Sequence, residues 1–237
     1  MRALRRLVVL LVVVGVLFVV ADRLAVNFAE DKAADKIRGS LGLSETPQVS
    51  VKGFPFLTQV ASGELTEVDA TLGGIEATAE GHRLRVTELS AQFHDVKLSS
   101  DYSSIEGAAS ATGEARISYA DLTKAAGDGV RVAYGGAGGG AGGGKSQVKI
   151  SPDVPVLSNL DVLGTISTAG GDTIRLRADE LPGLCTAVPG CEDKVRARTD
   201  HDWKLGELPA GLKLDRVTTT RDGIVVAAKG TDVRLPG

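Results

Sequence analysis

Aromatic residues are scarce in this chain of 237 residues, which has five Phe, three Tyr and one Trp. So small a supply argues against an aromatic-lined site for a nucleotide or a sugar. With only two Cys and three His, the sequence also excludes a Cys-rich tetrahedral zinc site. Apolar residues make up 43% of the chain, which is enough for a packed core, so wholesale disorder is excluded.

The chain also lacks an excess of basic residues, and its net charge is −3. Three of the 27 Lys and Arg lie in residues 1–21, which contain no acid, and the remaining 24 stand against 30 Asp and Glu. Phosphate binding depends on clustered Lys and Arg. The acidic body therefore argues against nucleic acid as a partner.

An apolar segment follows the first six residues. Met1–Arg6 is short and basic, and the fifteen residues Leu7–Ala21 contain no charged or strongly polar side chain. This is the layout of a secretory signal peptide, with Val19-Val20-Ala21 as a small-residue cleavage site. Because the apolar residues run all round the segment, a buried core helix is disfavoured.

An uncleaved signal anchor is the alternative for residues 1–21. Fifteen residues at about 1.5 Å each span about 22 Å, less than the roughly 30 Å hydrocarbon core of a bilayer. Snorkelling of the flanking Arg side chains or local thinning could close that gap. Either alternative predicts an extracytoplasmic body, secreted or tethered to the cytoplasmic membrane.

Cysteine usage agrees with export. Cys185 and Cys191 flank Pro189-Gly190, which predicts a turn that brings the two thiols together. In an oxidising compartment a small disulfide loop is the expected state, with free thiols as the alternative. The C-x5-C spacing fits neither a redox pair nor a usual zinc pair.

The body, residues 22–237, is predicted to be one α+β domain. An amphipathic helix over 22–41 has Leu24, Phe28, Ala33, Ile37 and Leu41 as its apolar positions, and it either packs on a sheet or lies at a lipid interface. Period-two alternation after Pro47 predicts mostly antiparallel strands, with a hairpin at Asp222-Gly223 and a short helix over 119–126. The alternating stretches are 49–51, 68–72, 84–86, 89–93, 96–98, 117–119, 148–150, 174–176, 212–214 and 224–228.

Eight of the ten residues in 135–144 are glycine, which predicts a flexible loop. Gly139–Ser146 matches the phosphate-loop pattern G-x-x-x-x-G-K-[ST], but a working phosphate loop leads into a helix. The residues after Ser146 alternate like a strand. No nucleotide is therefore expected as a partner.

Two His-Asp pairs do not form a catalytic site. His94-Asp95 and His201-Asp202 are adjacent in predicted strands, where neighbouring side chains point to opposite faces. The sequence has no G-x-S-x-G nucleophile elbow and no metal-ligand spacing. We expect no catalytic residue, no metal and no cofactor, and thus no enzyme.

Two segments resemble the LmeA-type phospholipid-binding family of actinobacterial envelopes. The first runs from Val51-Lys52-Gly53-Phe54-Pro55-Phe56-Leu57-Thr58-Gln59 into 63–73, and the second covers 208–226. The resemblance implies a fold similar to tubular lipid-binding proteins, in which a curled sheet wraps a long N-terminal helix around an apolar cavity. It also implies an exported lipid-binding domain whose ligand is a phospholipid or a phosphoinositide-type glycolipid.

Apolar residues on alternating strand positions are the candidate walls of that cavity, and the Phe-Pro-Phe turn either plugs the core or lines a lipid entrance. The candidates are Phe54, Phe56, Leu57, Val68, Leu72, Leu84, Val86, Leu89 and Phe93. We expect a protein that holds acyl chains for lipid transfer or glycolipid maturation. The alternatives are an accessory protein of envelope assembly that docks a protein partner, and a hydrolase or transferase acting on envelope lipids.

Overall fold

The computed structural model describes residues 2–79, 82–101, 104–126, 130–137, 146–152, 161–180, 189–205 and 208–234. The chain divides into two compact units. Unit 1 comprises residues 1–71, 91–111 and 231–237, and unit 2 comprises residues 72–90 and 112–230. The two units are described separately, and the prediction of a single domain over 22–237 stays a prediction.

The described residues form helices and antiparallel strands, which confirms the predicted α+β class with a long N-terminal helix. In chain order the elements are α1 (Arg2–Leu41), β1 (Gln48–Lys52), α2 (Phe56–Ser62), β2 (Glu64–Ala79), β3 (His82–Leu98), β4 (Ile105–Ser118), α3 (Tyr119–Ala126), β5 (Val130–Ala137), β6 (Ser146–Pro152), β7 (Val162–Ala169), β8 (Thr173–Glu180), α4 (Cys191–Thr199), β9 (His201–Lys204), β10 (Leu212–Thr219) and β11 (Gly223–Arg234).

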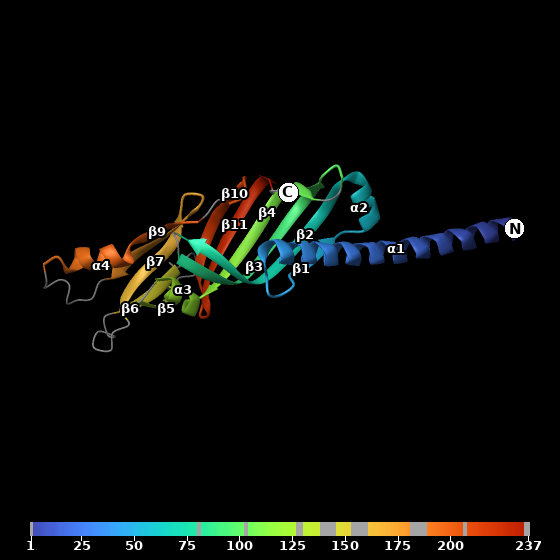
Figure 1. Ribbon diagram of the computed structural model, residues 1–237. Helices are drawn as coiled ribbons and strands as arrows, with labels where there is room; N and C mark the ends of the chain where they lie inside the picture. Colours follow the sequence, from blue (N-terminus) through green and yellow to red (C-terminus); the bar gives the residue numbers. More distant parts are fainter. Residues whose placement is uncertain are drawn as a thin grey trace. The chain divides into compact units, whose positions relative to one another are not determined.

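The strands form two sheets that do not close into a barrel. The first sheet has the order β1-β2-β3-β4-β11-β10, and the second has the order β5-β6-β7-β8-β9 (Figure 1). The antiparallel pairing of β10 with β11, in which Thr219 is opposite Ile224, confirms the hairpin predicted at Asp222-Gly223. The short helix predicted over 119–126 is α3.

Unit 1 is built around the second half of α1, the edge strand β1 and the short helix α2. Its buried core consists of Val26, Phe56, Leu65, Val68, Val96 and Ala108. The backbone N–H of Val51 donates a hydrogen bond of 2.7 Å to Glu30 Oε1, so α1 supplies an acceptor to the edge of β1. An edge strand whose backbone groups are satisfied in this way is protected from pairing with other chains.

The Gly-Phe-Pro-Phe motif joins β1 to α2 and β2. Gly53 has φ +93°, and a Cβ there would lie 2.8 Å from the Gln59 amide nitrogen. That amide donates to the carbonyl of Lys52 at 3.3 Å, and its oxygen accepts from the N–H of Thr66 at 2.8 Å. The motif thus has a structural role, because glycine leaves room for the side chain that links the ends of both strands.

The first half of α1 projects from the rest of unit 1, and all of residues 2–21 are exposed (Figure 1). Among the described residues α1 is the one helix long and apolar enough to cross a membrane, with a mean hydropathy of 2.7 over its most apolar window. A signal sequence near an N-terminus has the same properties. The segment therefore fits an anchor or a signal sequence.

The packing face of α1 differs from the predicted apolar face. Leu24, Phe28 and Leu41 are exposed, and Ala33 and Ile37 are half-buried. The positions that are buried instead are Asp22, Val26 and Ala34. The helix turns a carboxylate and small side chains toward the unit, and it leaves its large apolar side chains Leu24, Phe28 and Leu41 exposed.

Unit 2 has a separate core, which draws its buried residues from both sheets. Its members include Val86, Ile117, Val148, Ile166 and Leu214. Helix α3 covers the edge strand β5, where Thr123 Oγ1 accepts from the N–H of Val132 at 2.9 Å and donates to the carbonyl of Val132 at 3.3 Å. One hydroxyl therefore satisfies both backbone groups of that edge residue.

Parts of two predicted features lie outside the described residues. Strand β5 includes Gly135 and Gly136, so the predicted glycine loop begins later than expected, and 138–144 lie outside the description. Residues after the glycine tract form the strand β6, as the alternation predicted. The predicted pairing of Cys185 with Cys191 also lies outside the described residues.

Candidate functional site

An apolar cavity of about 250 Å³ lies within unit 2. One wall is the second sheet, through alternate residues of its strands: Val132, Val148, Ile150, Ile166, Ile174 and Leu176. Opposite residues come from the first sheet (Leu84, Ile117 and Ile224) and from α3 (Leu122, Ala125 and Ala126). None of the described residues that line this cavity comes from α1.

Polar groups are confined to one part of the lining. Thr199 at the end of α4 and His201 and Trp203 of β9 are the lining residues with side chains that can hydrogen-bond. The rings of His201 and Trp203 are 5.5 Å apart between centroids. Among the described residues, no Asp, Glu, Lys or Arg lines the cavity, and no group of three or more side chains could hold a metal ion. The arrangement suits an apolar ligand with a polar end.

An ion-pair cluster lies on β8 and β9 beside the polar end of the lining. Arg175 and Arg177 approach the two carboxylate oxygens of Asp202 at 3.0 Å and 2.8 Å. The hydrogen bonds from Arg175, and then those from Arg177, lower the pKa of Asp202 to about 2. The two guanidinium groups are thereby engaged with a carboxylate.

This cluster predicts a pH dependence of stability. Asp202 is ionised in both the folded and the unfolded state at neutral pH, and protonated in both well below pH 2. Because the folded state holds the lower pKa, the stability it contributes is present above about pH 4 and is lost as the pH falls to about 2. The difference in unfolding midpoint between the wild type and Asp202→Asn, measured by circular dichroism, should therefore shrink over that range. A difference that stays constant from pH 5 to pH 2 would contradict the assignment.

Tyr119, at the start of α3, packs against the core of unit 2. Burial, and then the neighbouring Tyr134, raise the pKa of Tyr119 to about 12. The phenol therefore stays protonated at neutral pH and donates a hydrogen bond of 2.8 Å to the carbonyl of Thr220 in the β10–β11 turn. This bond ties α3, one wall of the cavity, to the hairpin.

The structure divides the predicted cavity residues between the two units. Leu84 lines the cavity of unit 2, while Val86 and Leu89 belong to the core of the same unit. Phe56, Val68 and Phe93 lie in or against the core of unit 1, and Leu72 is buried. Phe54 and Leu57 are exposed, at 56% and 36%. Their role in lipid binding stays a prediction.

Most residues that line the cavity are not among the candidate residues predicted from the sequence, although the strands that carry them were predicted. Val148, Ile150, Ile174 and Leu176 lie in stretches whose alternation was recognised. Alternation identifies residues that share a face of a strand, but it does not identify the sheet opposite that face. No sequence signal distinguished these faces from those of a filled sandwich.

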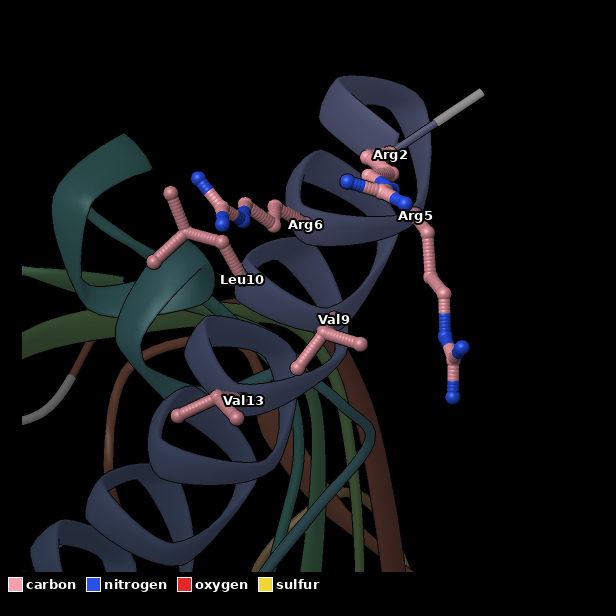
Figure 2. A pocket seen from close by; sticks show the side chains of 6 residues that line it. All are labelled: Arg2, Arg5, Arg6, Val9, Leu10 and Val13. Carbon is pink, nitrogen blue, oxygen red and sulfur yellow. The ribbon is translucent and has the colours of Figure 1, made fainter.

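A second hollow, of about 620 Å³, lies at the start of α1. Its lining consists of Arg2, Arg5, Arg6, Val9, Leu10 and Val13 (Figure 2). Figure 2 shows that all six side chains come from the first turns of one helix. Because no described residue of another element lines it, this hollow is a gap between side chains on a helix surface.

The α+β fold contains an apolar cavity whose described lining includes no acid, Lys or Arg, and such a cavity is chemically suited to an apolar ligand. The chain belongs to the LmeA-like phospholipid-binding family, whose model matches residues 20–229. This confirms the resemblance, and it identifies phospholipid as the general class of ligand. No curated protein and no solved structure matches the chain.

Proposed function

We propose that the cavity of unit 2 holds an acyl tail of a phospholipid. The observation that carries this proposal is an apolar cavity within a chain of a phospholipid-binding family. At about 250 Å³ the cavity is smaller than the roughly 300–1,000 Å³ of sites that enclose a drug-sized ligand. The cavity therefore has room for only a portion of one acyl tail. The head group remains outside the cavity or near Thr199 and His201.

The hydrophobic effect is sufficient to hold a tail in such a place. Burial of a methylene group is worth about 0.8 kcal/mol, so a segment of about eight methylenes gains roughly 6 kcal/mol before the entropy of ordering the chain is subtracted. Since the described lining includes no acid, Lys or Arg, insertion of the tail desolvates few polar groups. Binding of this kind is reversible and makes no covalent bond.

We further propose on which side of the membrane the protein binds lipid, and what this binding is for. Residues 1–21 act as an uncleaved signal anchor, so the body works outside the cytoplasmic membrane and stays beside it. The ligand is a phospholipid or a phosphoinositide-type glycolipid, which the protein carries during lipid transfer or glycolipid maturation without catalysing a reaction. The apolar first half of α1 and the family membership support this assignment.

A cavity-filling experiment tests the tail site. Ala125→Phe combined with Val132→Phe places two rings into the lining, whereas Ala120→Phe adds a ring to an exposed position of α3 that does not line the cavity. We expect native mass spectrometry of the full chain, delipidated and then mixed with phospholipid vesicles, to show several-fold less bound lipid in the double variant. The Ala120→Phe control should bind as the wild type does.

Two results would contradict the proposal. One is a wild-type protein that neither copurifies with lipid nor takes it up after delipidation. The other is a folded double variant, judged by circular dichroism, that still binds as much lipid as the control.

A further inference from the structure

The carboxylate that ends the apolar run of α1, Asp22, is covered by unit 1, while the side chain of its partner Arg23 is half-exposed. Asp22 is 0% exposed, and its Oδ1 accepts a hydrogen bond of 2.8 Å from the N–H of Leu57 in the first turn of α2. Its Oδ2 lies 3.2 Å from Nη2 of Arg23. The carboxylate at the point where a membrane span should stop is thus enclosed by the protein itself.

Beyond this point α1 still exposes two large apolar side chains, next to the exposed polar residues Asn27 and Asp31. Leu24 and Phe28, one helical turn apart, are each 65% exposed. The stretch from Leu7 to Phe28 is 22 residues long, or about 33 Å at 1.5 Å per residue. That length matches the roughly 30 Å hydrocarbon core, which Leu7–Ala21 alone does not reach.

On the side that faces unit 1, two further apolar side chains lie at the same level of the helix. The Arg23 guanidinium is 4.9 Å from the ring centre of Phe54, which is 56% exposed. Leu57, whose N–H binds Asp22, is exposed as well. Leu24, Phe28, Phe54 and Leu57, here called the apolar collar, therefore flank α1 where it leaves the apolar run.

We propose that the apolar collar lies at the boundary between hydrocarbon and head groups of the outer leaflet, so that unit 1 is seated in the surface of the bilayer. The inference rests on the proposed retention of α1 as an anchor. The bilayer is the occupant because two members of the collar, Leu24 and Phe28, follow the apolar span on the same unbroken helix, Arg2–Leu41, with no linker between them.

The chemistry of the neighbouring side chains fits this depth. Aromatic rings concentrate at membrane interfaces, and an Arg near a helix end extends its charged head toward the phosphates while its stem stays in the apolar layer. The half-exposed Arg23, which lies over the Phe54 ring, can extend its guanidinium toward the phosphates while Phe54 lies at the membrane interface. A carboxylate at this depth would be unfavourable in lipid, which explains why Asp22 is hydrogen-bonded and covered.

The test uses single-tryptophan variants of the full chain in vesicles of phosphatidylcholine with brominated acyl chains, in a Trp203→Phe background that removes the native tryptophan. The probes in the collar are Phe54→Trp and Leu24→Trp, and Leu11→Trp reports on the span. Leu41→Trp is the matched control, because Leu41 is as exposed as Phe54 at 56% but lies about 20 Å farther along α1 than Phe28.

We expect both collar probes to show blue-shifted emission and at least half of the quenching seen at Leu11→Trp, while Leu41→Trp is unquenched. If Leu11→Trp is quenched and both collar probes behave like Leu41→Trp, the seating is wrong and the anchor stands. If Leu11→Trp is also unquenched, the segment does not span the bilayer, and both the anchor and the seating are overturned.

Discussion

Replacing Gly223 with Ala will lower the thermal unfolding midpoint by about 6–12 °C, or prevent folding. Gly223 begins β11 next to β4, and a Cβ at this position would lie 2.1 Å from the carbonyl oxygen of Ile117. The obstacle is backbone, so it cannot move aside as a side chain would. Overpacking costs about 3 kcal/mol at the upper end of its usual range, and each kcal/mol shifts the midpoint of a chain of this size by about 2–4 °C.

The control for this prediction is Gly39→Ala in the same protein. A Cβ at Gly39 would meet nothing within 4 Å, and the residue lies inside α1, where Ala is favoured over Gly by about 1 kcal/mol. Scanning calorimetry of the two variants should therefore give shifts of opposite sign or very different size. Equal shifts would show that the close approach of β11 to β4 does not limit residue 223.

The turn before Gly223 shows what local sequence predicts well. Asp222-Gly223 between two alternating stretches predicts a hairpin, because turn residues and period-two patterns are set by neighbours in the chain. The same reasoning located α3 and most of the strands. It did not reveal that Gly223 is also required by its contact with Ile117, which is more than a hundred residues away in the sequence.

The face of α1 shows where local reasoning fails. A pattern of apolar spacing ranks Leu24 and Phe28 as inward and Asp22 as outward. The structure reverses this, because α2 offers an N–H that needs an acceptor and Asp22 supplies it. The Leu57 N–H comes next to Asp22 only through tertiary structure, so the residue pattern of the helix cannot predict this hydrogen bond.

The cavity shows a third limit of prediction from sequence. Alternation identifies an inner face only if the strand keeps the same face inward along its whole length. In β3, Phe93 and Val96 both pack in unit 1, although they are three positions apart and a regular strand would point them to opposite faces. Asp95 between them has φ +50°, an irregularity of the kind that reverses the direction of later side chains. A candidate inner face extended along such strands therefore divides between two cores.

Replacing Asp22 with Ala will release α2 from α1. The variant removes the acceptor of the Leu57 N–H and leaves that partly buried donor without its partner, at a cost of about 1–3 kcal/mol. Hydrogen exchange of the peptide that contains Leu57, measured by mass spectrometry on detergent-solubilised full chain, should therefore accelerate by roughly 5- to 150-fold. Asp22→Asn keeps an acceptor oxygen in the same place and should accelerate exchange far less.

The comparison of Asp22→Ala with Asp31→Ala distinguishes this local effect from a general loss of negative charge on α1, because Asp31 is exposed on the same helix. If both Ala variants accelerate exchange equally, the bond to Leu57 is not what holds α2. If Asp22→Ala alone does so, one carboxylate fixes the position of the Phe54–Leu57 segment against α1. The seating of unit 1 in the bilayer then depends on that carboxylate, because it holds two members of the apolar collar beside the span.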